Sequence, residues 1–365
     1  MILGALPPPL HGASVYYKNL INNKILHDAF RVYFVNINFG NILSSYQKFA
    51  LKKVERAFLF LMKYIILFIT KKIDLVFAGI AFPKYPFLKD SLFVILAKVF
   101  NKRIIGCVLG TGLKCQYQQS SSIMKKYYKF IGNCYTAFVT PGIKMSQTDF
   151  HSIFPVERLN FVPFGTNLVI DEKIKIESSI DFYNILYMGN FFSSKGIFDA
   201  IKSIKYVTRK HCNVKFIFAG NWMSPGDEEE AKKIINEDMI HDYIEFVGII
   251  TQQKKKEILA KSHIFLLPTY YEFEGFPLAL LDAMSCGHFI ITTDYAAIGE
   301  VIKDGINGLF CKKGDPKDLS QKILLAMENK DFFFNVRSKN INEFYEFYTH
   351  DKYVKRLVFV LEKYI

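Results

Sequence analysis

The chain has 365 residues, enough for about two domains that each bury a hydrophobic core. Half of the residues are hydrophobic and 22% are charged, which excludes an intrinsically disordered chain. The 47 Lys and Arg against 34 Asp and Glu give a net charge of +13, which favours phosphorylated substrates, acidic lipid surfaces or nucleic acid as partners. Nucleic-acid binding has only this charge in its favour, because no known reading module is present.

The cysteines and the apolar stretches indicate where the protein works. The six cysteines are dispersed, without the close pairs of a metal site or the density of a disulfide framework, so we expect reduced thiols and a cytoplasmic protein. The N-terminus lacks the charged and then apolar parts of a signal peptide. The longest apolar stretch, Ala57–Thr70, is interrupted by Lys63 and is shorter than the ~20 residues that span a bilayer, so we predict no transmembrane helix.

Short runs rich in Val, Ile and Phe alternate with longer helical patterns along the chain. This alternation predicts an α/β fold with parallel sheets joined by crossover helices. The strands expected in the first half are Ile2–Leu6, Arg31–Ile37, Ile73–Ile80, Arg103–Leu109, Tyr135–Thr140 and Leu159–Pro163. Those expected in the second half are Asn184–Gly189, Val214–Gly220, Tyr243–Val247, His263–Pro268, His288–Thr293 and Gly308–Cys311.

A polar, weakly periodic segment near residues 168–182 separates the two series of strands. Such a segment indicates a connection between two domains. After the second series, Asp315 can cap a helix and Pro316 suits its first position, so we expect the last helices to begin there.

The segment YYEFEGFPLALLDAMSCGHFIITT is the most informative about chemistry. A strand leads through a loop into a helix that we expect to begin near Gly275 and to end at Gly287. The N-terminus of such a helix presents free N–H groups and a positive dipole end, which suit a diphosphate. Asp282 follows Glu274 by eight positions, or about 12 Å along a helix, so that one carboxylate can reach a sugar and the other a ribose.

This segment resembles the donor-site signature of the family 4 retaining glycosyltransferases, in which seven residues separate two glutamates in an EGFP-like context. The later segment EVIKDGINGLFCKKGDPKDL is similar to the family's continuation. Upstream, NILYMGNFFSSKGIFDAI is similar to the diphosphate-binding loop, and LPPPLHGAS to the first strand-to-helix loop. The resemblance spans nearly the whole chain and is strongest in the C-terminal half.

The resemblance implies a GT-B fold, which has two Rossmann-like domains with parallel sheets facing across a cleft. Residues 1–168 would bind the acceptor and residues 183–345 the nucleotide-sugar, with a helix at 346–365 packing back on the first domain. It implies a hexosyltransferase that needs no cofactor or metal and moves a sugar from a UDP- or GDP-sugar to a glycan or lipid-linked acceptor, as in bacterial surface-polysaccharide assembly. The sequence agrees about the metal, because no two aspartates lie two positions apart as in Asp-x-Asp metal sites.

The same resemblance assigns roles to residues of the site. Lys195 and Glu274 are the catalytic candidates: the lysine would stabilise the departing nucleotide diphosphate, and the glutamate would orient the sugar. Asp282 would accept hydrogen bonds from the ribose, and His11 is an acceptor-side candidate. The predicted donor-binding residues are Gly12, Gly189, Asn190, Lys195, Val247, Gly248, Glu274, Gly275, Phe276, Pro277, Leu278 and Asp282.

Three positions depart from the family's pattern. Asp282 replaces the usual second glutamate, Asn190 stands where many relatives have an arginine, and Leu109 stands where many have an active-site histidine. The proton acceptor of the reaction therefore stays open between His11 and an oxygen of the donor's own phosphate. A GT-B nucleotide-sugar epimerase, or a binding protein with a degraded site, is the alternative interpretation.

The segment SSYQKFALKKVERAFLFLMKYIILF predicts an amphipathic helix. Its basic face would hold Lys48, Lys52, Arg56 and Lys63, and its apolar face Leu51, Val54, Phe58, Leu61 and Ile65. Such a helix could lie on an anionic membrane, or be an ordinary domain helix with a solvated basic stripe. Peripheral contact with the inner face of the cell membrane therefore remains an open expectation beside the cytoplasmic location.

Overall fold

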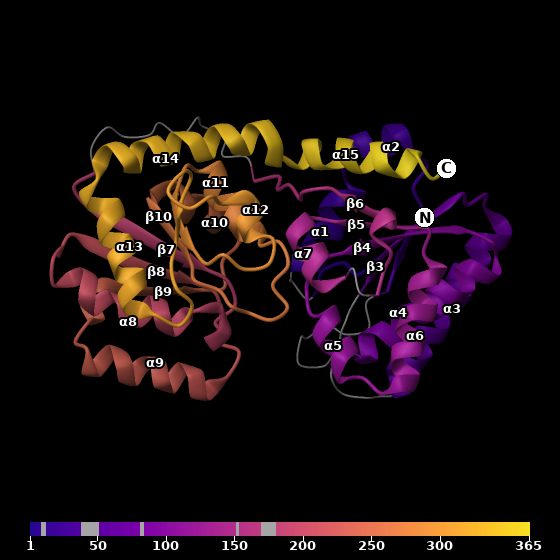
Figure 1. Cartoon of the computed structure of the whole chain (residues 1–365), viewed down its shortest axis with the longest axis horizontal. Coiled ribbons are helices and arrows are strands. Elements are labelled where there is room, and N and C mark those ends of the chain that lie inside the picture. The colour runs from indigo at the N-terminus through magenta and orange to yellow at the C-terminus, as the bar shows by residue number, and fades with distance from the viewer. Residues whose placement is uncertain (9–11, 38–50, 81–83, 151–152, 169–179) are drawn as a thin grey trace. The chain divides into compact units, whose positions relative to one another are not determined.

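The computed structural model describes residues 1–8, 12–37, 51–80, 84–150, 153–168 and 180–365 (Figure 1). The chain divides into two compact units: unit 1 consists of Met1–Phe164 with His350–Ile365, and unit 2 of Gly165–Thr349. The predicted interdomain connection at 168–182 lies mostly outside the described residues, as do His11 and Lys48.

Unit 1 contains a parallel sheet of six strands in the order β2-β1-β3-β4-β5-β6. All six strands predicted for the first half are present, each shorter than its apolar run because pairing stops where the neighbouring strand ends. Pairing of the first two strands, for example, covers only Ile2 with Phe34 to Gly4 with Asn36. The strands are β1 Ile2–Gly4, β2 Phe34–Asn36, β3 Leu75–Ile80, β4 Arg103–Val108, β5 Ala137–Thr140 and β6 Leu159–Phe161.

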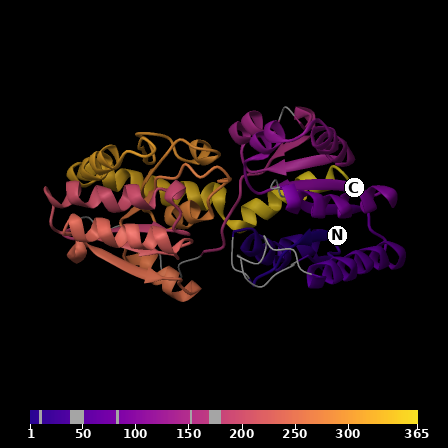
Figure 2. The same ribbon diagram turned by 90° about the horizontal axis from the view of Figure 1, so that it is seen from below.

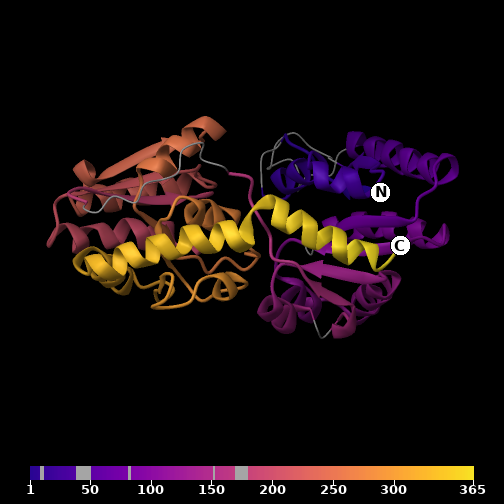
Figure 3. The ribbon, with the colours of Figure 1, turned by 90° about the horizontal axis from the view of Figure 1, so that it is seen from above.

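Helices cover both faces of this sheet, because right-handed crossovers in opposite directions leave on opposite faces. The helices α3, α4 and α6 lie side by side (Figure 1), whereas α15 lies along α2 (Figure 3). The hydroxyl of Tyr16 in α1 hydrogen-bonds to that of Tyr353 in α15. The helices of unit 1 are α1 Gly12–Ile21, α2 Lys24–Ala29, α3 Leu51–Thr70, α4 Lys84–Val99, α5 Leu113–Gln119, α6 Ser122–Cys134, α7 Ile143–Asp149 and α15 His350–Glu362.

The predicted amphipathic helix exists as α3, but its buried face differs from the expected one. Tyr64 and Phe68 are buried, whereas Phe58, expected on the apolar face, is 62% exposed. The hydrophobic period could not show which side packs on the core, because every residue from Ala57 to Ile69 except Lys63 is apolar. Lys63 is exposed as predicted, and the side chains of residues 51–57 lie outside the described part.

Unit 2 contains a second parallel sheet, in the order β12-β11-β10-β7-β8-β9, with helices on both faces (Figure 2). All six strands predicted for the second half are present. They are β7 Tyr183–Met188, β8 Val214–Ala219, β9 Ile244–Gly248, β10 Ile264–Leu267, β11 Phe289–Thr292 and β12 Leu309–Phe310. The helices are α8 Ile197–Thr208, α9 Pro225–Glu237, α10 Gln252–Lys261, α11 Leu278–Ser285, α12 Ile298–Val301, α13 Pro316–Glu328 and α14 Lys330–Glu343.

The core of unit 2 lies on both faces of its sheet. Every residue of β10 and β11 is buried, as expected for inner parallel strands with near-continuous hydrophobic sequences. The start of α13 follows the prediction: Oδ1 of Asp315 accepts hydrogen bonds from the backbone N–H groups of Lys317 and Asp318 at 3.1 and 3.0 Å, and Pro316 is the first helical residue.

The buried His288 and the half-buried His263 make the stability of unit 2 depend on pH. Burial lowers the pKa of His288 from 6.5 to about 3, and that of His263 from 6.5 to about 4. In the folded protein His288 donates from Nε2 to the carbonyl of Leu259 at 2.7 Å. Below pH 6.5 the unfolded chain binds protons that the folded protein does not, so this stability is complete above pH 6.5 and is lost as the pH falls toward 3.

We therefore expect His288→Gln, which can still donate to Leu259, to flatten the pH dependence of the unfolding free energy by up to about 1.4 kcal/mol per pH unit between pH 6 and 4. Urea unfolding followed by the fluorescence of Trp222, the one tryptophan of the chain, measures this in unit 2. His241→Gln, at an exposed position of the same unit, serves as control. Identical slopes for His288→Gln and the wild type would contradict the expectation.

Candidate functional site

The strand order of unit 2 places a topological switch point between β7 and β10. The chain passes from β7 to β8 and β9 on one side and then returns to β10 on the other side. In open parallel sheets, ligands bind at the carboxyl ends of the strands beside such a point. Lys195 follows β7 and Glu274 follows β10, so both catalytic candidates leave the sheet here.

A glycine brings the two loops together. Gly196 has a φ of +77°, and a Cβ on it would lie 2.3 Å from the carbonyl oxygen of Pro268, so only glycine fits without a shift of the backbone. The backbone N–H of Tyr270 also donates to the carbonyl of Ser194 at 2.8 Å. Lys195, at the end of a 3-10 turn over Ser193–Lys195, is thereby fixed against the loop that follows β10.

The side chains of Lys195 and Glu274 form an ion pair, with Nζ 3.4 Å from Oε2. The lysine side chain is 20% exposed and the glutamate side chain 9% exposed. Thr269 donates from Oγ1 to the same carboxylate oxygen at 3.1 Å, and the Lys195 ammonium lies 5.3 Å from the ring centroid of Tyr271. Burial, and after it the charge of Glu274, raises the pKa of Tyr271, so this ring stays neutral beside the pair.

The structure corrects the expected start of the helix after Glu274. Helix α11 begins at Leu278, and Glu274 to Pro277 form a loop rather than its first turn. The reason lies in Pro277, which disfavours helical backbone in the residue before it and is itself extended, with a ψ of 110°. The expected separation of 12 Å along one helix axis therefore does not apply. The predicted end is confirmed, because Gly287 adopts a φ of +64° just after the helix.

Asp282 on α11 is nearly inaccessible, at 2% exposure, and already has partners within unit 2. Its Oδ1 accepts a hydrogen bond from Oγ1 of Thr166 at 2.7 Å. Its Oδ2 forms an ion pair and hydrogen bond with Nζ of Lys255 on α10. The structure thus places Asp282 in a buried polar cluster that ties α10 and α11 to the start of unit 2.

Other predicted donor residues lie along the carboxyl edge of the same sheet. Gly189 and Asn190 follow β7, and Val247 and Gly248 end β9. Gly220, which the sequence did not single out, joins them: its N–H donates to the carbonyl of Gly248 at 3.0 Å, and a Cβ on it would lie 1.8 Å from the carbonyl oxygen of Gly189. Gly189 and Gly248 thus leave open space beside the backbone at this edge, whereas Gly220 lets the loop after β8 pack closely against Gly189.

Some predicted residues are not part of this group. Gly12 is the first residue of α1 and belongs to unit 1, and His11 lies outside the described residues. Leu109, the position of the missing histidine, follows β4 in unit 1 and is half-buried.

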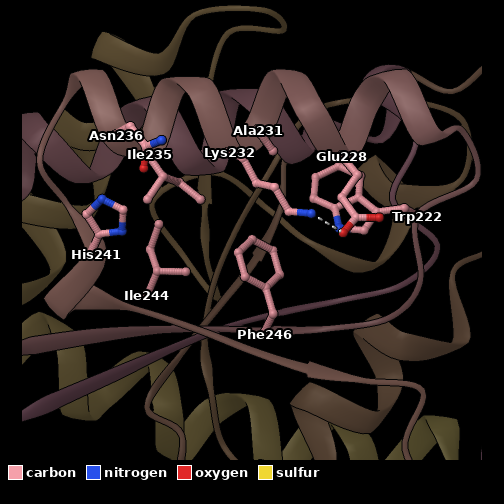
Figure 4. A pocket seen from close by; sticks show the side chains of 9 residues that line it. All are labelled: Trp222, Glu228, Ala231, Lys232, Ile235, Asn236, His241, Ile244 and Phe246. Atoms are coloured by element: carbon pink, nitrogen blue, oxygen red, sulfur yellow. Dashed lines mark ion pairs between the residues drawn. The ribbon is translucent and has the colours of Figure 1, made fainter.

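A separate hollow of about 380 Å³ lies in unit 2, between α9 and the edge strand β9 (Figure 4). An ion pair between Lys232 and Glu228 spans 2.8 Å on its α9 side, and Ile244 and Phe246 form the strand side. No residue predicted for the donor lines it, so the hollow and the Lys195–Glu274 group are distinct features.

Sequence reasoning missed four side chains of the candidate site. Thr269 and Tyr271 precede Glu274 by five and three positions in the same loop. Their nearness in sequence to the predicted glutamate is the signal that could have identified them. Lys255 stands in a run of three lysines and Thr166 lies 116 residues before Asp282, and no local pattern links either to it.

Residues 170–345 match the family model described as Glycosyl transferases group 1. That segment includes every predicted site residue after Leu109, and so contains the whole Lys195–Glu274 group.

Curated relatives match part of the chain. An uncharacterized glycosyltransferase from Methanocaldococcus jannaschii is 31% identical over 155 residues, which cover 41% of this chain and 40% of that protein. N,N'-diacetylbacillosaminyl-diphospho-undecaprenol alpha-1,3-N-acetylgalactosaminyltransferase from Campylobacter jejuni is 39% identical over 80 residues, which cover 22% of this chain and 21% of the relative. The matches thus span less than half the length of these two relatives.

Solved structures match over nearly the whole chain. Anabaena HepE, crystallised in complex with UDP, superposes with a TM-score of 0.74 at 12% identity and covers 99% of this chain and 98% of its own. An identity this low shows the fold alone. The predicted α/β fold of the GT-B type, with two Rossmann-like units, is confirmed.

The contact at Gly196 can be tested by adding one methyl group. We expect Gly196→Ala to lower the unfolding free energy of unit 2 by at least about 3 kcal/mol. The strain of a side chain at positive φ adds to the clash of the new methyl group with the carbonyl oxygen of Pro268. Gly314→Ala is the matched control: Gly314 has a φ of +68° and open space around it, so its cost should stay near 1 kcal/mol. Urea unfolding followed by Trp222 fluorescence measures both, and equal losses would refute the role of the Pro268 contact.

The buried cluster at Asp282 predicts a stability effect of its own. We expect Lys255→Met to cost about 3 kcal/mol, because it leaves the buried carboxylate without its cation. Lys254→Met removes the neighbouring lysine, whose side chain is 56% exposed, and should cost less than about 1 kcal/mol. In a double-mutant cycle, Asp282→Asn should recover most of the loss of Lys255→Met. Strictly additive losses would show that the two side chains do not interact.

Proposed function

We propose that the chain is a family 4 retaining glycosyltransferase of the hexosyltransferase type, which uses a UDP- or GDP-sugar as donor and a glycan or a lipid-linked glycan as acceptor. The observation that supports this most is the ion pair between the half-buried Lys195 and the buried Glu274 at the switch point of unit 2. An ammonium and a carboxylate 3.4 Å apart can contact neighbouring groups of one ligand, such as the phosphate and the sugar of a nucleotide-sugar.

In this reaction the bond between the anomeric carbon and the donor phosphate oxygen breaks, and the acceptor oxygen bonds to that carbon on the same face. Lys195 stabilises the negative charge that develops on the departing nucleotide diphosphate, which is electrostatic stabilisation in a largely buried site. Glu274, held by Thr269, accepts hydrogen bonds from sugar hydroxyls and fixes the ring. The acceptor's proton passes to His11 or to an oxygen of the departing diphosphate.

The nucleotide would lie along the carboxyl edge of the sheet. Gly189 and Gly248 leave room for the diphosphate and the base to approach the backbone, as their lack of Cβ contacts indicates. For Asp282 to meet the ribose, the side chain of Lys255 or Thr166 would have to move aside, because the carboxylate is 2% exposed and holds both partners. No cofactor or metal takes part in this proposal.

The acceptor and the location are proposed from the name of one relative. The Campylobacter relative is named for a diphospho-undecaprenol substrate, which supports a lipid-linked acceptor and a site of action at the inner face of the cell membrane. Within the described ranges, no helix is both long and apolar enough to cross a bilayer. The name of the Campylobacter relative and the net charge of +13 support peripheral contact with an anionic membrane.

A nucleotide-sugar epimerase or a binding protein with a degraded site is the second candidate. Leu109 and the exposed Asn190 favour it, because neither can supply the proton transfer or the second cation expected at these positions. Lys195 and Glu274, in contact with each other, favour the transferase.

We expect release of nucleoside diphosphate from one donor in a panel of UDP- and GDP-sugars, in the presence of a metal chelator and a lipid extract. Glu274→Gln and Lys195→Met should each lower the rate by at least about 100-fold, because each removes a charge used at the reacting sugar or phosphate. Glu272→Gln at an exposed position and Lys202→Met at a half-buried one should retain most activity. Donor binding without release, or full activity of Glu274→Gln, would contradict the proposal.

A further inference from the structure

Large apolar side chains are exposed in rows on the outer side of unit 1. On α3, Leu59, Met62, Ile66 and Ile69 follow one helical face and are 40–70% exposed. On the neighbouring α4, Tyr85, Leu92 and Val99 recur every seven residues and are 80%, 48% and 73% exposed. Rows at helical spacing differ from the scattered exposed apolar residues of ordinary surfaces.

The third helix of this layer continues the pattern. On α6, Ile123 and Phe130 are 82% and 56% exposed and lie on one face, seven positions apart. The helices α3 and α4 are in contact, as are α4 and α6, and Figure 1 shows them together. We call the exposed side of α3, α4 and α6 the outer face.

The sheet does not account for this apolar surface. The helices already use other aromatic side chains for the core: Tyr64 on α3, Phe87 and Phe93 on α4, and Tyr128 on α6 are buried. A helix that is apolar on its solvent side as well as on its core side is typical of a surface with a further apolar partner.

Charge identifies that partner. Unit 1 carries 25 Lys and Arg against 8 Asp and Glu, a net charge of +17, whereas unit 2 carries 22 against 26, a net charge of −4. On α6 there are three lysines and no acidic residue, and the exposed Lys126 and Lys129 lie between Ile123 and Phe130. Basic side chains interleaved with apolar ones match the chemistry of an anionic lipid surface.

We propose that the outer face docks on an anionic lipid bilayer, with the apolar rows entering the boundary between headgroups and acyl chains and the lysines contacting lipid phosphates. Lysine side chains suit this position because their apolar stems can lie in the boundary while the ammonium groups reach the headgroups. A second copy of the chain fits less well, since two faces of the same positive charge repel each other. The docking itself is argued from exposure and charge alone. Its purpose rests on the proposed function, because a lipid-linked acceptor would lie in the membrane on which the outer face docks.

Co-sedimentation with vesicles tests the proposal directly. The full chain is mixed with vesicles of phosphatidylcholine alone, or of phosphatidylcholine with phosphatidylglycerol in equal amounts. We expect binding to the mixed vesicles that is at least about tenfold tighter than to the neutral ones and that weakens as salt is added. Equal binding to both vesicles, or binding to neither, would overturn the proposal.

Matched variants locate the surface. Ile69→Ser, Val99→Ser and Ile123→Ser together remove one exposed apolar side chain from each helix, and should lower the vesicle partition coefficient at least about tenfold. Met239→Ser, Ile306→Ser and Leu325→Ser together, at exposed sites of unit 2, should leave it unchanged. Wild-type binding by the first variant would overturn the assignment of the outer face.

A charge reversal tests the second component of the surface independently. Lys126→Glu with Lys129→Glu should reduce binding to the mixed vesicles at least about tenfold, whereas Lys232→Glu with Lys233→Glu on α9 should not. Circular dichroism and urea unfolding confirm that each variant is folded. Equal losses in the two reversals would show attraction by overall charge alone and overturn the proposal.

Two further measurements separate the possible failures. Sedimentation equilibrium without lipid should show a monomer; a dimer that the three-serine variant abolishes would assign the outer face to a second copy and overturn the proposal. Nucleoside diphosphate release from a soluble donor should be the same in the outer-face variants as in the wild type. Loss of release in every form of the protein would overturn the proposed function while leaving the vesicle result intact.

Discussion

The close approach of two loops at Gly196 is the constraint on which the candidate site depends. The glycine lies directly against the carbonyl of Pro268. The neighbouring hydrogen bond from the backbone N–H of Tyr270 to the carbonyl of Ser194 holds the two loops together. Lys195 and Glu274 are 79 residues apart in sequence, and neither loop alone would bring their charges together. A site at the switch point of the sheet therefore depends on one residue without a side chain.

Buried charge around this contact is paired in two places that have different consequences. The Lys195–Glu274 pair is partly open, so a ligand that brings its own charges and hydroxyls can take over each partner. The Lys255–Asp282 pair, with Thr166, is more enclosed and joins α10 and α11, so its first effect is on stability. Asp282, which stands where the family's pattern has a longer glutamate, is thus within reach of the ammonium group of Lys255 and forms an ion pair with it.

Much of the fold could be predicted from the sequence, because it depends on local patterns. Inner parallel strands are continuous apolar runs, and the twelve inner and edge strands in the described part of the chain were all located, as was the helix that begins at Asp315 and Pro316. The prediction was wrong where two local signals compete: the Glu-Gly pair suggested a helix start, but Pro277 delays it to Leu278. Lys195 and Glu274 could be named from their motifs, whereas Thr166 and Lys255 depend on contacts across the fold that no motif contains. The side of α3 that faces the core could not be predicted, because both sides are apolar.

The opposite net charges of the two units have a consequence for the way the protein would approach a charged boundary. In the field of an anionic layer, unit 1 is drawn inward while unit 2 is weakly pushed away, so the molecule is turned before any side chain touches the boundary. This torque acts over about one Debye length, roughly 8 Å at physiological ionic strength. Encounters between the protein and the anionic layer would thus be oriented rather than random. The fraction of molecules that reach the layer with unit 1 first would fall as the ionic strength of the solution rises.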